Sequence, residues 1–423
     1  MNQLHYEDLG ETLYGCTLAN GLTVRVVPRP GFTRSLAYFV TDFGSIHRDF
    51  LLEGRQIHTP AGIAHFLEHK MFELPGRDVS AEFAALGANV NAFTSYDMTA
   101  YYFSCTANFE ENLRLLLEFV STPYFTEESI RRELGIIDQE IGMSEDSPER
   151  CFENLMTVLY RDHPVRIPIL GTREDLRQIT VSLLEDCHRA FYTPENMILC
   201  VVGNVDPDRV CHIAEEVLGS QRKPVGEKLR LWQETMTHKQ ELFRMDMEVA
   251  MPTFQLGFKC EPIGCGEAAI RQEIIGDLAA EALFGESSTL YLQMYEEGLI
   301  DSSFGGGFET LDGCSLLICG GDSDHPEAVR DALIRQAGIL AQQGIGQQDF
   351  LRMKRSALGR RIRDLDSFDS TCFRVCAYHF SDFDYFLFPK VYAEVTEQEI
   401  REFLSRVVTA ERAALSVLDP IHE

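Results

Sequence analysis

One stretch, spaced as H-x-x-E-H, constrains this chain more than any other. Thr59 is a favourable N-cap, and Pro60 suits the first helical position, where its missing N–H costs no hydrogen bond. On the helix that follows, His65 and His69 are four residues apart and share a face. Glu68 comes three residues after His65, so its carboxylate lies on nearly the same side. The stretch therefore predicts two imidazoles and a carboxylate presented together by one helical turn.

Two imidazoles one turn apart can hold a single metal ion. The order H-x-x-E-H inverts the H-E-x-x-H of the zinc-protease helix, in which the glutamate is the general base. The alternative is an amphipathic helix whose histidines have no common role. We expect the metal site, because a third ligand can be found downstream.

A catalytic zinc ion usually takes three protein ligands and leaves one position open. The best candidates for the third ligand lie on a helix expected at residues 126–144. At 100° per residue, Glu133 and Glu140 fall within about 20° of each other. Both lie just off one edge of an apolar stripe, so either carboxylate could turn inward. Surface helices also carry glutamates, and the spacing alone leaves both interpretations open. The stripe consists of Ile130, Leu134, Ile137 and Ile141.

The chain has 423 residues, which is too many for one hydrophobic core. Residues 193–201 and 409–417 each join a helix to a buried strand. We therefore expect a duplicated α+β domain, with a sheet on one side and helices on the other. Only the first copy carries the H-x-x-E-H pattern. The predicted ranges are 1–220 for the zinc-binding catalytic domain, 221–240 for a polar linker and 241–423 for a homologous non-catalytic domain.

Apolar periodicity and turn residues predict the order of elements. Strands are expected at 11–28 (a hairpin turning at Ala19-Asn20-Gly21), 34–42, 88–95, 99–106, 197–203, 249–260, 301–310, 314–320 and 413–418. Helices are expected at 78–86, 109–121, 126–144, 148–161, 181–191, 266–284, 287–297, 326–344, 347–365, 367–381 and 396–406. One more helix is expected to follow the strand at 197–203 and to end at about 218.

Composition excludes some classes of function. A formal charge of −28 argues against nucleic-acid binding, which needs clustered Lys and Arg. No apolar run reaches the roughly 18 residues that span a bilayer, and the first residues are polar and acidic, unlike a signal peptide. Twelve cysteines without a C-x-x-C pair suggest free thiols in a reducing cytoplasm.

The motifs together resemble the pitrilysin family of zinc peptidases, which includes insulysin and mitochondrial processing peptidase. The likeness covers most of the chain and is densest at residues 44–45, 62–72, 89–95, 132–141 and 194–197. It implies two LuxS/mitochondrial-processing-peptidase-like domains, each a mainly antiparallel sheet packed by helices.

The resemblance also implies roles for single residues. His65, His69 and Glu140 would bind zinc, and Glu68 would be the general base that takes a proton from the attacking water. Glu133 would not touch the metal and would either orient a ligand histidine or hold the charge balance. The expected activity is a zinc-dependent endopeptidase that hydrolyses small or unfolded peptides.

Substrate binding is expected at Asn91, Ala92 and Phe93, which match the edge strand where family members add a peptide as an extra strand. The alternative is an ordinary strand with a buried phenylalanine. Relatives of this length often work as dimers. Family members also carry an Arg and a Tyr in the second domain that reach the substrate carbonyl, but this chain has Tyr295 and Asp301 at those positions.

Loss of two donors to the oxyanion would cost about a hundredfold or more per donor in rate. One hypothesis is therefore that a homologous partner chain without the metal motif completes the site, in a homo- or heterodimer. A second is a catalytically weak or inactive structural subunit. A third is a zinc hydrolase of a non-peptide substrate.

Overall fold

The computed structural model describes residues 1–421, which fall into two compact units. The units do not divide the chain at a single point. Residues 142–167 belong with the second half of the chain, and residues 362–387 belong with the first half. Unit 1 contains residues 1–141, 168–231 and 362–387, and unit 2 contains residues 142–167, 232–361 and those from 388 onward.

Unit 1 is built on a seven-stranded sheet in the order β1-β2-β3-β11-β4-β10-β9. Neighbouring strands are antiparallel, except that β11 runs parallel to β3. β9 therefore forms one edge of the sheet. The strands are β1 (Asn2–Tyr6), β2 (Glu11–Thr17), β3 (Thr23–Pro28), β4 (Ser35–Thr41), β9 (Ala88–Thr94), β10 (Thr99–Cys105) and β11 (Met197–Gly203). Short strands outside this sheet are β5 (Asp49–Leu52), β6 (Arg55–His58), β7 (Glu73–Leu74), β8 (Arg77–Asp78) and β12 (Glu227–Lys228).

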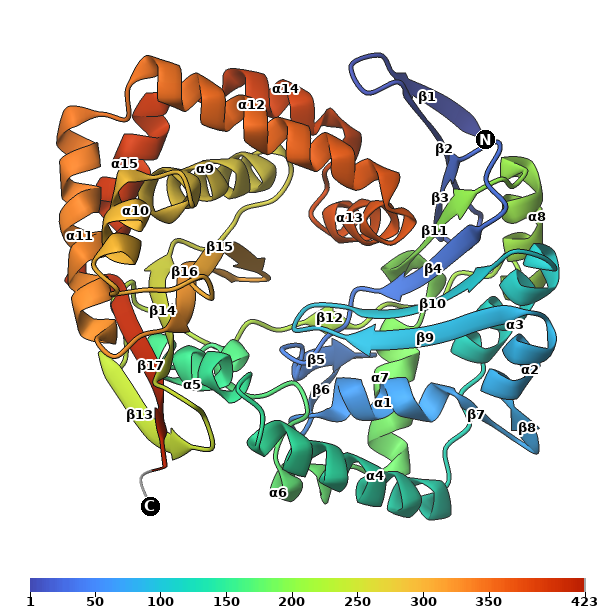
Figure 1. Ribbon diagram of the computed structural model, residues 1–423. Coiled ribbons are helices and arrows are strands. Elements are labelled where there is room, and N and C mark those ends of the chain that lie inside the picture. The colour runs from blue at the N-terminus through green and yellow to red at the C-terminus, as the bar shows by residue number, and fades with distance from the viewer. Residues whose placement is uncertain (422–423) are drawn as a thin grey trace. The chain divides into compact units, whose positions relative to one another are not determined.

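Helices cover both faces of this sheet (Figure 1). Strand side chains alternate between faces, and one face packs into the large apolar core of the unit. The other face carries Cys200 of β11, whose carbonyl accepts a bond from the Cys372 thiol of α13 at 3.8 Å. The helices are α1 (Ile63–Met71), α2 (Val79–Ala85), α3 (Phe109–Ser121), α4 (Glu127–Glu145), α6 (Arg173–Leu176), α7 (Val181–Phe191), α8 (Pro207–Leu218) and α13 (Phe368–Phe380).

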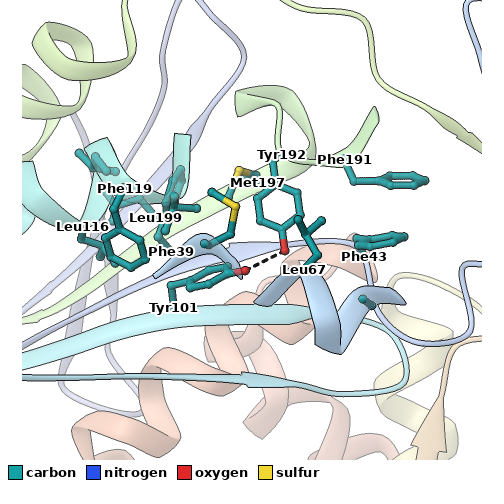
Figure 2. Packing of buried hydrophobic residues seen from close by; sticks show 14 of the residues in the cluster. Phe39, Phe43, Leu67, Tyr101, Leu116, Phe119, Phe191, Tyr192, Met197 and Leu199 are labelled. Carbon is teal, nitrogen blue, oxygen red and sulfur yellow. Dashed lines mark hydrogen bonds between the residues drawn. The ribbon is translucent and has the colours of Figure 1, made fainter. Parts of the chain in front are cut away.

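Aromatic side chains fill the core beneath α1 (Figure 2). Tyr101 and Tyr192 are buried, and their hydroxyls lie 2.9 Å apart, so each polar group has a partner. Leu67 of α1 is fully buried in the same cluster. The metal-motif helix is thus held rigidly by the core on its apolar side.

Unit 2 repeats the central plan with a five-stranded sheet in the order β13-β17-β14-β16-β15. β17 runs parallel to β13 and antiparallel to β14, as β11 does to β3 and β4. The predicted duplicated α+β architecture is therefore confirmed. The strands are β13 (Leu242–Met247), β14 (Thr253–Cys260), β15 (Gly305–Leu311), β16 (Cys314–Asp322) and β17 (Ala413–Pro420). The helices are α5 (Arg150–Leu159), α9 (Glu267–Phe284), α10 (Thr289–Glu296), α11 (Pro326–Gln343), α12 (Gln347–Arg363), α14 (Phe388–Glu394) and α15 (Glu397–Val407).

The predicted start of the motif helix is wrong. α1 begins at Ile63 after Gly62, not after a Thr59 cap. Thr59 is fully buried and its hydroxyl donates to the Arg48 carbonyl at 3.1 Å, so it is held in the preceding turn. Gly62 has φ +82°, and a Cβ there would lie 2.3 Å from the Leu170 carbonyl oxygen. Tertiary contact therefore overrides the local capping signal.

Two other expectations need correction. The strand expected at 249–260 begins only at Thr253, as β14, and the strand that precedes it, β13, was not predicted. The expectation of free thiols fails for Cys16 and Cys211, which form a disulfide between β2 and α8. The other ten cysteines, all within residues 1–421, form no disulfide. Among residues 1–421, no helix has the length and apolar character needed to cross a membrane.

Candidate metal centre

α1 presents its polar side chains from a largely buried position. Phe66 and Leu67 have no exposed surface and anchor the helix in the core. His65 and Glu68 remain only 8% and 7% exposed, so both polar groups lie in a desolvated setting. Burial of that kind requires partners or a ligand for each group. The partners come from α4 and β9.

Glu140 of α4 meets both histidines. Its Oε1 lies 3.6 Å from His65 Nε2, and its Oε2 lies 3.8 Å from His69 Nε2. One donor atom from each residue can be chosen so that all three lie within 4.8 Å of one another. This is the single His/Cys/Asp/Glu group of that kind found within residues 1–421.

The donor set fits zinc. Zinc bonds to nitrogen and carboxylate oxygen measure about 2.0–2.2 Å, so two ligands in a tetrahedral arrangement lie about 3.3–3.6 Å apart. The observed separations of 3.6 and 3.8 Å are close to that value. Two imidazoles and one carboxylate are also a ligand set found at catalytic zinc, with the fourth position open.

Glu133 fixes the orientation of His69. His69 Nδ1 lies 2.9 Å from Glu133 Oε1, and a carboxylate can only accept, so Nδ1 carries the proton. Nε2 is then left unprotonated and faces Glu140 as a ligand requires. Glu133 is buried, and its second oxygen lies 3.8 Å from the fully buried Lys70 ammonium. Lys70 also pairs with Glu73.

His65 is suited to remain neutral. Burial, together with the nearby His69, lowers the pKa of His65 to about 3. Its Nδ1 is buried and has no hydrogen-bond partner among the described residues. The neutral ring leaves Nε2 available to a metal at any pH near 7. For His69, burial lowers the pKa, but the Glu133 bond and the charges of Glu68 and Glu140 raise it overall.

Glu68 lies beside the ligand set and has its own support. Burial raises its pKa, and the bond from Thr94 partly opposes that shift. Thr94 Oγ1 donates to Glu68 Oε2 at 2.6 Å, which leaves Oε1 available for another group. A raised carboxylate pKa suits a general base that must accept and then release a proton.

The predicted substrate-binding residues lie on β9, whose outer edge has no neighbouring strand among residues 1–421. Asn91 pairs with Tyr102 of β10, and its Oδ1 accepts a bond from the Ala92 N–H at 2.9 Å. The Phe93 ring centroid lies 6.1 Å from that of Phe373 on α13. Because Thr94 on the same strand reaches Glu68, the edge adjoins the candidate metal centre.

Tyr295 and Asp301 are engaged locally within unit 2. Tyr295 stacks on Tyr291 with ring centroids 6.2 Å apart and is 49% exposed. Asp301 Oδ1 accepts bonds from the Ser303 backbone N–H at 2.8 Å and from its hydroxyl at 2.5 Å. Neither residue has a positive charge to offer an oxyanion.

Sequence reasoning missed two residues of this centre. Thr94 lies 26 positions from Glu68, and nothing in the local pattern of β9 distinguishes its hydroxyl from that of any strand threonine. Lys70 follows the motif directly and would be expected in solvent, because lysine is rarely fully buried. The signal in the sequence is that Lys70 follows the apolar Phe66 by four residues and so shares its helix face.

Comparisons with known proteins agree with this geometry. Residues 57–173 match the family model described as Insulinase (Peptidase family M16), and residues 178–357 match the Peptidase M16 inactive domain. The zinc protease YmfH of Bacillus subtilis is 36% identical over 429 residues, covering 99% of each chain.

Solved structures give the same result. The crystal structure of an M16-like peptidase from Alicyclobacillus acidocaldarius has 33% identity and a TM-score of 0.94, covering 98% of this chain and 100% of the other. A protease from Helicobacter pylori shares the fold at 19% identity, with a TM-score of 0.79 over 96% and 99% of the two chains. The chain therefore belongs to the insulinase family of zinc proteases, peptidase family M16.

Proposed function

We propose that this chain is a zinc endopeptidase of small or unfolded peptides, with His65, His69 and Glu140 as ligands. The convergence of these three donors beside the buried Glu68 is the observation that carries the proposal. When bound there, zinc lowers the pKa of a coordinated water to about 7 and polarises a carbonyl.

The protein's own residues perform the proton transfers. Glu68 takes a proton from the attacking water and returns it to the leaving amine, so that one peptide bond and one water become a carboxylic acid and an amine, which ionise to a carboxylate and an ammonium. Thr94 holds Oε2 of Glu68 and keeps the carboxylate aimed at the site. Glu133 holds His69 in the tautomer that leaves Nε2 unprotonated.

The edge of β9 supplies a way to hold the substrate. An extended peptide can pair with the unpaired edge at Asn91, Ala92 and Phe93 through main-chain hydrogen bonds. The Asn91 side chain would first release the Ala92 N–H. Such pairing requires an extended chain, which favours unfolded peptides over folded proteins.

The experiment uses the purified full chain. We expect about one zinc per chain and cleavage of internal bonds in a fluorogenic peptide library, with both lost in Glu140→Gln. Zinc content without cleavage, even in the presence of a partner, would contradict the peptidase. If the chain is active but cleaves only non-peptide esters or amides, the chain is a hydrolase of another class and not a peptidase.

We further propose that a homologous partner chain completes the site. This proposal is supported by Tyr295 and Asp301, which stand where relatives place an arginine and a tyrosine and which supply no cationic donor. We expect weak activity from this chain alone, and an increase when a homologue that lacks the metal motif but carries that pair is added. If the chain alone is fully active, no partner is required. If the pair is also inactive, the chain is a structural subunit.

A further inference from the structure

Lys70 follows the second histidine of the motif directly, and its side chain is completely buried. The Lys70 side chain is 0% exposed, whereas the neighbouring His69 side chain is 26% exposed. Lys259 of β14 is the only other buried lysine within residues 1–421. Because a buried ammonium is costly unless opposite charges surround it, the neighbours of Lys70 indicate what the position does.

A row of alternating charges leads from the protein surface to His69. Arg132, exposed on α4, donates a hydrogen bond to Glu73 at 2.8 Å. Glu73 pairs through its other oxygen with Lys70. Lys70 Nζ lies 3.8 Å from Oε2 of Glu133, and Oε1 of Glu133 lies 2.9 Å from His69 Nδ1. The row thus connects four ionisable side chains to an imidazole of the candidate metal centre.

Glu133 divides its two oxygens between the histidine and the lysine. Oε1 meets His69, and Oε2 faces Lys70, which is the one lysine or arginine within 4.0 Å of this carboxylate among residues 1–421. The last torsion of a glutamate is only weakly restricted by its own geometry, so the neighbours of the two oxygens decide its orientation. Since the carboxylate is planar and rigid, a charge that attracts Oε2 also fixes the direction of Oε1.

Lys70 forms its ion pairs with Glu73 and Glu133, and with none of the three candidate metal ligands. Its ammonium can therefore affect a bound metal by orienting Glu133 or by repelling the metal at longer range. The two routes have opposite signs. Loss of the ammonium would weaken metal binding by the first route and strengthen it by the second.

We propose that Lys70 is a positioning residue of the metal centre. Its ammonium fixes the Glu133 carboxylate, which holds His69 with Nε2 free to bind the metal. This inference rests on the proposed ligand set and adds a residue that does not touch the metal. Groups that hold a ligand histidine typically contribute 10–100-fold to metal affinity. Lys70 is one contact further away, so we expect an effect of about tenfold.

Zinc affinity of the purified full chain is the readout, measured by competition with a chelating dye. Lys70→Met keeps an unbranched side chain without the charge and should weaken zinc binding about tenfold. Lys259→Met, in unit 2, is the matched control. Lys259 is 1% exposed, pairs with Glu234 and donates to the Leu159 carbonyl at 3.1 Å. Its replacement should lower stability and leave zinc affinity unchanged.

A double-mutant cycle tests whether Lys70 acts through Glu133. Glu133→Ala alone should weaken zinc binding by about 10- to 100-fold. Lys70→Met in that background should cause no further loss, because no carboxylate remains for the ammonium to orient. Equal losses in the two backgrounds would overturn the proposal. Unchanged or tighter zinc binding in Lys70→Met alone would overturn it as well.

Glu73→Gln provides a second variant in case Lys70→Met folds poorly. Glu73 competes with Glu133 for the ammonium, and its side chain is 27% exposed. Zinc should bind this variant at least as tightly as the unaltered chain. A tenfold loss would show that packing around Lys70 sets the affinity, and would overturn the proposal.

The same measurements separate this proposal from the proposed activity. Zinc binding that depends on Lys70 without any peptide cleavage would contradict the peptidase and support the positioning role. Peptide cleavage with zinc affinity that is independent of Lys70 would do the reverse. A chain that binds no zinc would overturn both.

Discussion

The two units place a polar triad on corresponding pairs of helices, but with different residue types. In unit 1, α1 lies in the chain between β4 and β9 and presents two histidines four residues apart to Glu140 of α4. In unit 2, α9 lies between β14 and β15 and presents Glu273 and Asp277, also four residues apart, to Arg361 of α12.

The difference lies in what supplies the positive charge. Arg361 is 5% exposed and bonds Glu273 at 2.6 Å and Asp277 at 3.2 Å, so the cation of unit 2 is a side chain. In unit 1 the three donors meet without a side-chain cation among them, which fits a divalent metal ion. A duplicated fold thus keeps a polar junction between two helices. Its residue types decide whether the junction is structural or can hold a metal.

The largest expected effect comes from removing a metal donor. Glu140→Gln should reduce zinc from about one per chain to a small fraction. Peptidase activity should fall by more than about 10⁴-fold, because loss of the metal also removes the activated water from which Glu68 takes a proton. Metal analysis and peptide hydrolysis measure the two losses, and a chelator should reproduce the second. Glu273→Gln is the matched control in unit 2 and should leave zinc content unchanged. Equal loss of zinc from both variants would show that the two triads do not differ in metal binding.

The next effect separates chemistry from metal binding. Glu68→Gln keeps the shape of the side chain but removes the basic oxygen, so kcat should fall by about 10²–10⁴-fold while zinc content stays near one per chain. Single-turnover hydrolysis with parallel metal analysis checks both. Retained activity would show that Glu68 is not the base.

A stability effect should mark the ion triad of unit 2. Arg361→Met leaves two partly buried carboxylates without their cation, and the loss is expected to be about 1.5–3 kcal/mol of unfolding free energy. Chemical denaturation measures it, with zinc content as the check that unit 1 is unaltered. Arg352→Met, at an exposed arginine paired with Asp349 at 3.5 Å, should cost less than about 1 kcal/mol. Similar losses of unfolding free energy in both variants would show that the Arg361 triad stabilises the protein no more than an exposed ion pair does.

The smallest effect concerns the orientation of the base. Thr94→Val removes the 2.6 Å bond to Glu68 while keeping the shape of the side chain. A hydrogen bond to a charged group contributes about 1.5–3 kcal/mol, so kcat should fall by roughly 10- to 100-fold with zinc retained. Thr94→Ser, which keeps the hydroxyl, should restore most of the rate. If the serine variant is as slow as valine, the role of Thr94 is packing.

Local pattern was sufficient for most elements and for the core of the site. Helix α3, helix α7 and strand β11 have the predicted bounds, because the two helices show apolar periodicity, the strand is one continuous apolar run, and all three end at clear turn residues. His65, Glu68 and His69 were predicted together because they share one helical turn. Elements without such signals, including β1, β5, β6 and α14, were not predicted, since they depend on pairing or packing with distant parts of the chain.

The sequence by itself determined the turn of helix that carries His65, Glu68 and His69, because residues three and four apart meet by the geometry of the helix alone. It also determined the duplicated order of strands and helices. Only the tertiary structure decided that Glu140 faces both histidines, that Thr94 holds Glu68, and that α13 covers the first sheet. Those contacts join residues dozens to hundreds of positions apart, and packing of whole elements, not local periodicity, sets which side chains then meet.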